Sequence, residues 1–549
     1  MMCPALRGCL ALAAVMCAAA AAGAPGAKDT GRPQWQSLGA NSGCGRSAGA
    51  SAPLGVREES AQSVEECQRR CLEDAGFCKA VEFRAKGSLC RLLGEGVRAM
   101  HIAAGSECVR RLDEQYTEIY VMLPLDVISP LKTITDPTGL EHMFDSLQTV
   151  GVDGFMVDVW WRFTEPSPKA YDFAVYKDLF AMAKARGWKV QVVSSFHQCG
   201  GNAGDSCNIP LPDFVLEAKD VWYKDAAGRE TMEYISLFAD EVNIKGRTPL
   251  AMYRDWFDAF AAAFSEELGS VIADVMVGLG PAGELRYPSY PLSHWSFCGI
   301  GEFQAYDKHA LKSLKQAAAA AGHAEDWALP PPADDVGDYN SHGHETAFFT
   351  EGFSTDFGQF FLDWYSGALK QHGARILGAA REALNGKAEI SGKVAGIHWW
   401  YDYPSHPAEA TAGYYNTNFR NAYAEIADVF AKEGATLDFT CLEMKNTDNA
   451  EECHSRPEYL VMQVIEAAKS KGIKFAGENA LPRYDHWAYE QMAGYAEHVD
   501  AITYLRLSSV LTEAENLERF ADFVEALHGA PADAAAPAAG AGAGAGADE

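Results

Sequence analysis

The chain has 549 residues, 48% of them hydrophobic and 22% charged, which is a composition typical of globular proteins. Its 46 Lys and Arg residues face 75 Asp and Glu residues, so the formal net charge is −29. Nucleic acid and anionic membrane surfaces require a basic face, and no cluster of Lys and Arg occurs, so the sequence disfavours both as partners. A neutral ligand such as a sugar is not repelled by this charge.

The first 27 residues have the pattern of a secretory signal peptide. Arg7 is their only charge, an apolar stretch follows at 9–22, and small residues come next at Gly23 and Ala24. A membrane anchor is the alternative, but the run is shorter than the ~20 residues that cross a bilayer. We expect the protein to enter the secretory pathway and to be secreted, or alternatively to reach a vacuole or plastid by this route. After cleavage of the signal peptide we expect no membrane attachment.

Closely spaced cysteines mark a separate module at 35–112. An even, dense set after a signal peptide indicates a disulfide framework, and six cysteines alone allow 15 pairings. A metal cluster is the alternative, disfavoured because no histidine lies at zinc-like spacing. Ser63 and Glu66 form a capping-box pattern that predicts a short helix. The cysteines are Cys44, Cys67, Cys71, Cys78, Cys90 and Cys108.

The stretch SVEECQRRCLEDAGFCKAVEF within this module resembles the PAN/apple family. The resemblance implies a small α+β domain with the disulfides Cys67–Cys90, Cys71–Cys78 and Cys44–Cys108. It also implies a protein or carbohydrate ligand, although a stabilising module without a ligand is an equal alternative.

The region 116–528 alternates apolar, β-branched-rich runs with helix-like stretches, among them 138–150, 171–186, 253–268 and 458–471. This alternation predicts a parallel sheet, and eight units predict an α/β fold of the (β/α)8 TIM-barrel type with long loops. An open doubly wound sheet is the alternative, but no glycine-rich phosphate loop follows the first run. The expected strands are 119–125, 154–160, 189–196, 275–279, 394–399, 437–442, 474–477 and 501–505.

Carboxylates and aromatic residues gather where these expected strands end, and in a TIM barrel those ends meet in one cavity. Two carboxylates can act as acid and base on either side of one bond, and Trp and Tyr offer flat faces to sugar rings. No nucleophilic Ser–His pair stands out and no HExxH motif occurs, so we expect neither a serine nucleophile nor a paired-histidine metal site. The residue types therefore indicate glycoside hydrolysis.

Each residue also has a purely structural explanation. Asp158 could pair with Arg162, His197 could be a core histidine, and Glu284 and Glu478 could be ordinary loop carboxylates. Five further cysteines are odd in number and scattered, so we expect mostly free thiols, with buried and inert ones at the strand ends. These cysteines are Cys199, Cys207, Cys298, Cys441 and Cys453.

The region 116–527 resembles the β-amylases of glycoside hydrolase family 14. The similarity rests on strings that lie at the expected strand ends and follow the same order. The strings are YVMLPL, GVDGFMVDVWW, SFHQCGGNAGD, GLGPAGELRYPSYP, GIHWWY, DFTCLEM, AGENALPRYD and TYLRLS.

The resemblance implies Glu284 as general acid and Glu478 as general base, with no cofactor and no metal. It implies that GGNAGD at 200–205 is a mobile lid and that 439–444 is an inner loop that shifts on binding. The implied activity is release of β-maltose from the non-reducing end of α-1,4-glucan, that is, starch or maltodextrin. The implied glucose contacts are Asp158, His197, Asp205, Lys393, His398, Thr440, Asn479, Ala480 and Arg506.

Two other functions remain open at this point. A retaining barrel glycosidase would place its carboxyl groups ~5–5.5 Å apart rather than ~6.5–9.5 Å. A non-catalytic glucan sensor would be expected to lack the acid, the base or a lid residue, and none of these is replaced here. Two segments depart from the family pattern, LSHWSF after Tyr290 and the histidine-rich insertion 338–357, and are expected to alter outer sugar subsites. The Ala/Gly-rich residues 529–549 predict a flexible tail.

Overall fold

The structure is a computed structural model. It describes residues 116–528 in full and, as backbone only, five strands within 35–111. The expected signal peptide, the helix opened by Ser63, the three expected disulfides of the module and the tail lie outside the described residues.

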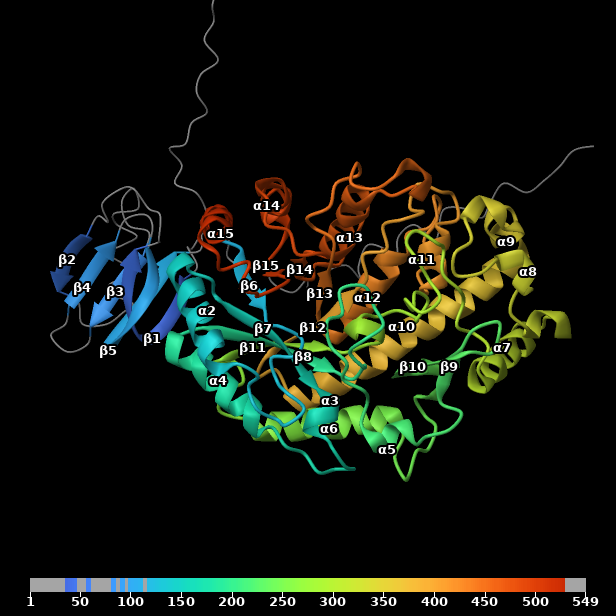
Figure 1. Cartoon of the computed structure of the whole chain (residues 1–549), viewed down its shortest axis with the longest axis horizontal. Coiled ribbons are helices and arrows are strands. Elements are labelled where there is room, and N and C mark those ends of the chain that lie inside the picture. Colours follow the sequence, from blue (N-terminus) through green and yellow to red (C-terminus); the bar gives the residue numbers. More distant parts are fainter. Residues whose placement is uncertain are drawn as a thin grey trace, which may run out of the picture.

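The N-terminal strands form one antiparallel sheet in the order β1-β5-β3-β4-β2. Figure 1 shows this sheet at one end of the molecule, apart from the larger domain. The strands are β1 (Trp35–Arg46), β2 (Val56–Ser60), β3 (Ala80–Arg84), β4 (Leu89–Leu93) and β5 (Val97–Arg111).

Eight parallel strands close into a barrel, as the alternating pattern predicts, and the open doubly wound sheet is ruled out. Each expected run overlaps one strand. The strands are β6 (Glu118–Met122), β7 (Gly154–Trp160), β8 (Lys189–Ser195), β11 (Ile272–Val277), β12 (Glu389–Val394), β13 (Thr436–Phe439), β14 (Phe475–Glu478) and β15 (Ala501–Tyr504).

The fifth barrel strand is the one that the sequence places wrongly. The apolar run at 394–399 overlaps β12 only at Val394 and is otherwise a loop. The real strand, EISGKV, is too polar to read as a buried strand, because Ser391 and Lys393 find charged partners inside the barrel. These interior contacts, one hydrogen bond and one ion pair, make the strand polar, and a pattern based on hydrophobicity therefore misses it.

Helices surround the barrel (Figure 1), and the four expected ones are confirmed. α2 illustrates the local rules: the Asp136 side chain accepts the Gly139 N–H at its start, and Gly151 ends it in the left-handed region at φ 81°. The helices are α2 (Pro137–Val150), α3 (Trp161–Thr164), α4 (Ala174–Arg186), α5 (Asp213–Leu216), α6 (Pro249–Ala263), α7 (Lys308–Ala321), α8 (Ala333–Val336), α9 (Ala347–Thr350), α10 (Asp356–Leu384), α11 (Pro407–Thr411), α12 (Ala422–Glu433), α13 (Pro457–Lys471), α14 (His486–Ala493) and α15 (Ala514–Leu527).

Along β7 the barrel interior changes from apolar to polar. Met122, Met156, Val193 and Met276 form a small apolar cluster of their own, separate from the main core under the helices. Asp158 lies opposite Val193 in the ladder and follows Met156 by two residues, so it faces the same interior side. β7 thus carries a carboxyl group inward near its carboxyl end.

Two disulfides correct the expectation of mostly free thiols. Cys199 pairs with Cys207, and Cys298 pairs with Cys453 across 155 residues. Among the described residues only Cys441 is free, and it is buried as expected. The number of cysteines in this region is odd because one thiol, Cys441, stays unpaired. Spacing along the sequence cannot show which distant loops the fold brings close enough to form a disulfide.

The described residues contain no helix that is long and apolar enough to cross a membrane.

Candidate active site

Three strand ends bring Glu284, Lys393 and Glu478 together. Glu284 follows the short 3₁₀ turn η2 (Pro281–Gly283) after β11, and its backbone bridges that of Lys393 on β12. The Leu285 N–H donates to the Lys393 carbonyl at 2.8 Å. The Lys393 ammonium forms an ion pair with Glu478 at the end of β14. Lys393 therefore joins both candidate carboxyl groups, one through its backbone and one through its side chain.

The charge of Lys393 is secured by the surrounding carboxyl groups. Burial alone lowers the pKa of Lys393, but Glu478, Asp438 and Glu284 raise it by more, so the net shift is upward. Glu478 is fully buried, and within the described chain its oxygens accept no hydrogen bond of good geometry. The ion pair with Lys393 is thus the feature that holds this carboxylate in place.

Asp438 is a third carboxyl group that the sequence reading missed. It lies opposite Lys393 and Ala476 in the ladders, on the same face as Glu478 two residues further along β14. It is 1% exposed, and neither of its oxygens accepts a hydrogen bond from the described residues. Burial and the charge of Glu478 raise the pKa of Asp438 well above its usual range. Asp438 is therefore a buried carboxyl group whose protonated form is favoured by its surroundings, on the same face as Glu478.

Glu284 has a different setting, because its partner belongs to the loops. Arg286 Nε contacts Glu284 Oε2 at 2.5 Å, and the Glu284 side chain keeps 14% of its surface exposed. Burial lowers the pKa of Arg286, but Glu284 and Glu233 raise it by more, so its pKa is raised. Arg286 also donates from Nη2 to the Asn202 side-chain oxygen at 2.9 Å, which links Glu284 to the glycine-rich lid.

Asp158 and His197 each have a buried polar atom without a partner. Ser195 Oγ donates to Asp158 Oδ1 at 2.7 Å, while Asp158 Oδ2 and His197 Nδ1 have no hydrogen-bond partner in the described chain. Burial, followed by the charges of Lys393 and Arg286, lowers the pKa of His197 to about 3, so the ring is neutral. Buried polar atoms are usually hydrogen-bonded, so these two atoms are candidates for contacts with a polar ligand.

The structural explanation offered for Asp158 is wrong. Arg162 pairs with Asp213 instead of Asp158. Burial raises the pKa of Asp158, and the nearby guanidinium of Arg506 opposes that shift. Arg506 itself donates to the Leu123 carbonyl at 3.1 Å, so both groups are fixed at the mouth of the barrel.

The glycine-rich loop at 200–205, which the resemblance implies is a lid, is hydrogen-bonded within itself and to Glu233, a residue that the sequence analysis did not identify. Asp205 Oδ2 accepts the N–H groups of Gly200 and Asn202, both at 2.9 Å. The Asn202 amide donates to Glu233 at 2.5 Å, and the Ala282 N–H donates to the same oxygen at 3.1 Å. Burial, opposed by Arg286, raises the pKa of Glu233 to about 7. Glu233 lies on β10 (Glu230–Ile235), which pairs with β9 (Trp222–Lys224) in the loop after β8, and no sequence pattern pointed to it.

The inner loop at 439–444 is tied to the segment that follows Glu478. The buried Glu443 carboxylate accepts the N–H of Ala480 at 2.9 Å and that of Leu481 at 2.9 Å. Asn479 accepts the Leu505 N–H at 2.7 Å and donates to the Leu505 carbonyl at 2.5 Å. Thr440 is half-buried beside them. The side-chain amide of Asn479 is thus hydrogen-bonded to the backbone of Leu505, directly after β15. A contact of this amide with a sugar has to form while those two bonds are kept.

An aromatic wall stands beside His398. The Trp399 ring lies 5.0 Å from Tyr290 and 5.5 Å from Trp295, and Phe297 packs against it with 48% of its surface exposed. Trp295 and Phe297 belong to the LSHWSF segment. Burial lowers the pKa of His398 to about 4, and its Nδ1 is 2.8 Å from Ser455 Oγ. Tyr290, Trp295 and Trp399 are buried, so only Phe297 of this wall presents an exposed ring face.

Comparison with known proteins agrees with this arrangement. The model of glycosyl hydrolase family 14 matches residues 120–531, and that of the PAN domain matches residues 49–110. The chain is 46% identical to a β-amylase of Medicago sativa over 75% of this chain and 87% of that protein. It is 47% identical to the chloroplastic β-amylase 2 of Oryza sativa subsp. japonica, over 74% and 76%.

A solved structure gives the same answer. The catalytic domain of β-amylase from Paenibacillus polymyxa aligns with a TM-score of 0.64 at 28% identity, covering 76% of this chain and 99% of that one. A family model that spans most of the chain, relatives near half identity and a shared barrel all agree. The chain belongs to glycosyl hydrolase family 14.

Proposed function

We propose that this protein is a β-amylase that removes β-maltose from the non-reducing ends of α-1,4-glucans with inversion at the anomeric carbon. The observation that carries the proposal is the placement of Glu284 and Glu478 on either side of Lys393. The relatives named above are β-amylases, which supports an α-glucan as substrate. Neither the retaining glycosidase nor the non-catalytic sensor is favoured.

Glu478 acts as the general base in this proposal. Its carboxylate, held by Lys393, takes a proton from water while the water oxygen attacks the anomeric carbon. Glu284 acts as the general acid, and its proton goes to the glycosidic oxygen as the bond to the anomeric carbon breaks. Water enters from the face opposite the leaving group, so the new hydroxyl is β. Solvent exchange then moves the proton from Glu478 back to Glu284.

The chain end is bound by the polar groups at the mouth of the barrel. Asp158 Oδ2 and His197 Nδ1 have no partner and are suited to glucose hydroxyls, and the uncharged His197 ring can donate or accept. Closure of the lid would remove bulk water and strengthen these contacts. The remaining proposed contacts are Asp205, Lys393, His398, Thr440, Asn479, Ala480 and Arg506.

Maltosyl fluoride separates the two catalytic roles, because fluoride leaves without being protonated. We expect Glu284→Gln and Glu478→Gln to lower kcat on starch by about 100- to 10,000-fold. Only Glu284→Gln should keep substantial turnover of α-maltosyl fluoride. Glu230→Gln, at an exposed carboxyl on β10, is the control. Retained fluoride hydrolysis by Glu478→Gln and its loss in Glu284→Gln would reverse the assignment, and full starch activity in both would refute it.

We further propose that the protein is made in the secretory pathway, with residues 1–27 removed. The two barrel disulfides support an oxidising route, because such bonds are rare in reducing compartments. N-terminal sequencing of the mature protein tests this, and a chain that begins at Met1 would contradict it. The PAN-like module at 35–112 is proposed to bind a protein or carbohydrate outside the catalytic site, which glucan-binding assays with and without the module would test.

A further inference from the structure

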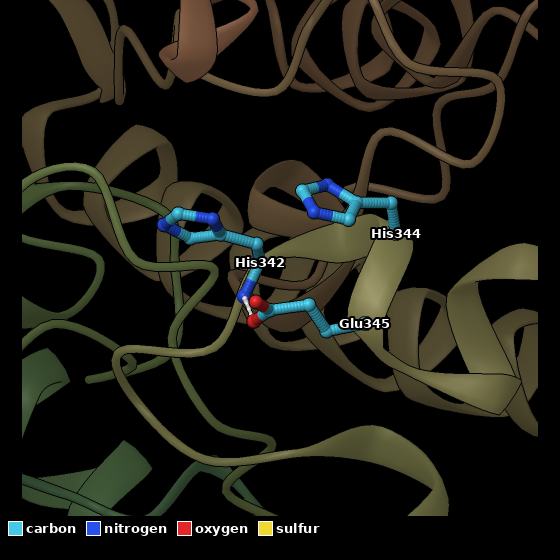
Figure 2. A group of neighbouring side chains, drawn as sticks. All are labelled: His342, His344 and Glu345. Atoms are coloured by element: carbon cyan, nitrogen blue, oxygen red, sulfur yellow. Dashed lines mark hydrogen bonds between the residues drawn. The ribbon is translucent and has the colours of Figure 1, made fainter.

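We propose that His342, His344 and Glu345 form a binding site for a divalent transition-metal ion such as Zn²⁺. One ligand atom from each side chain lies within 4.8 Å of the other two. Figure 2 shows the three side chains projecting from a single turn, in the histidine-rich insertion between β11 and β12. Two imidazoles and a carboxylate are ligands that zinc commonly uses, with water completing an open coordination sphere.

Hydrogen bonds within the turn already orient the carboxylate. The turn contains the 3₁₀ helix η4 (Gly343–Glu345), and the Glu345 N–H donates to the His342 carbonyl at 3.0 Å. The His342 N–H donates in return to Glu345 Oε2 at 3.0 Å, the dashed line in Figure 2. That bond uses one carboxylate oxygen and leaves the other free to bind an ion. A backbone bond of this kind is the outer support that metal-binding carboxylates usually have.

The buried Trp400 ring packs against both imidazoles. The ring centroid of Trp400 lies 5.4 Å from His342 and 5.7 Å from His344. A Cβ atom on Gly343 would lie 3.2 Å from Trp400 Cε3 and 2.9 Å from Pro407 Cγ, so only glycine lets the turn come this close. Both histidines therefore flank the tryptophan face, and the turn loses little freedom when it binds an ion.

Trp400 is itself held rigidly by the barrel disulfide. Its indole N–H donates to the Cys298 carbonyl at 2.7 Å, and its backbone N–H donates to the Cys453 carbonyl at 2.7 Å. Cys298 and Cys453 are bonded to each other. The surface on which the histidines rest is thus anchored from two distant parts of the chain, which favours a preformed site over an accidental cluster.

The ligand set selects the class of ion. Ca²⁺ and Mg²⁺ prefer oxygen ligands in larger number, whereas two imidazole nitrogens favour Zn²⁺, Ni²⁺ or Cu²⁺. The imidazoles must be neutral to bind, so affinity should fall in acid. All three ligands lie within four residues, and the unfolded chain therefore keeps part of the affinity. Direct binding is for this reason a better measure than thermal stability.

The experiment is calorimetric titration of ZnCl₂ into the mature protein after treatment with EDTA. We expect one ion per chain, and affinity about 10-fold or more weaker in His342→Gln and in His344→Gln. Quenching of tryptophan fluorescence by Cu²⁺ should weaken in parallel, since Trp400 contacts both rings. His323→Gln is the matched control, because His323 also stacks on a tryptophan, Trp327 at 3.8 Å, but belongs to no group of three possible ligands among the described residues.

Three outcomes would overturn the proposal. The first is no saturable Zn²⁺ binding by the wild-type protein. The second is binding by His342→Gln and His344→Gln that is as tight as in the wild type. The third is a loss of affinity in His323→Gln as large as in these two variants. His344 and Glu345 are exposed, so His344→Gln and Glu345→Gln should fold normally even if His342→Gln, which is half-buried, does not. Hydrolysis of starch is not part of the readout, so the result stands apart from the proposed activity.

Discussion

The two candidate catalytic carboxyl groups differ in what holds them. Glu478 ends a barrel strand, is fully buried, and meets Lys393 and Asp438 from the two preceding strands. Glu284 follows a short turn, and Arg286 connects it to the lid through Asn202. The side that carries the proposed base is thus built into the barrel. The side that carries the proposed acid is built from loops, which is where lids that close over a substrate usually occur.

Removing the cation from the strand-built side should have the largest effect. Lys393→Met leaves Glu478 and Asp438 buried without a positive partner, which should cost about 3–5 kcal/mol of unfolding free energy. It should also lower kcat by about 100-fold or more, because the base is no longer held. Lys474→Met is the control: its pair with Glu389 is exposed and should contribute about 0–1 kcal/mol. Urea denaturation and starch assays measure both, and equal effects of the two variants would contradict the comparison.

Asp438 tests whether the barrel side depends on a polar neighbour of Glu478. Burial and the charge of Glu478 raise the pKa of Asp438 well above its usual range. We expect Asp438→Asn, which can still donate a hydrogen bond to Glu478, to retain most of kcat on starch. Asp438→Leu cannot donate one and should lower kcat about 10- to 100-fold. Equal impairment of the two variants would refute this role for Asp438.

The pH dependence of stability in a Glu233 variant tests the side of the site that is built from loops. Its pKa is raised to about 7 by burial, above the 4.5 of the unfolded chain. The folded state therefore binds more protons between these values, so the contribution of Glu233 to stability is complete below pH 4.5 and is lost as pH rises through 7. Glu233→Gln keeps an oxygen for Asn202 and Ala282 but cannot ionise.

We expect Glu233→Gln to match the wild type at pH 4.5 and to be about 1–3 kcal/mol more stable at pH 8. Denaturant unfolding at the two pH values measures this. A constant difference between the proteins at both values would show that Glu233 acts through shape and not through charge.

The smallest effect is expected at Cys441, directly after Thr440 on the inner loop. Burial and then the charge of Glu443 raise the pKa of its thiol well above the usual range. A buried, protonated thiol is a poor nucleophile. We expect a thiol reagent to leave Cys441 unlabelled in the native protein and, after unfolding without reductant, to label Cys441 but no other cysteine of residues 116–528, as peptide mass mapping would show. Rapid labelling of Cys441 in the native protein would contradict its burial, and labelling of a second cysteine in this range would contradict the disulfide pairing.

Sequence patterns locate the barrel better than they locate its interior chemistry. Period and β-branched content mark seven of the eight strands, because most of each of these strands packs against helices. The position of β12 is missed because Lys393 makes it polar, and that polarity reflects an ion pair visible only in three dimensions. Asp438 carried a usable signal, since a carboxylate inside an apolar run must find a partner.

Other features have no linear signal. Glu233 becomes part of the site only because a hairpin inserted after β8 folds back onto η2 and the lid. The pairing of Cys298 with Cys453 likewise depends on two loops that meet over the barrel. Residues at strand ends can be read from order alone, whereas residues brought in by loops cannot.

The most direct test of the account is the anomeric form of the first product. Proton NMR during early hydrolysis of maltoheptaose distinguishes β-maltose from α-maltose before mutarotation mixes them. Rigid activation of water by Glu478, with protonation by Glu284 from the other side, predicts that β-maltose appears first. Early α-maltose would mean retention, and it would contradict the division of the site into a base held by the barrel and an acid held by loops.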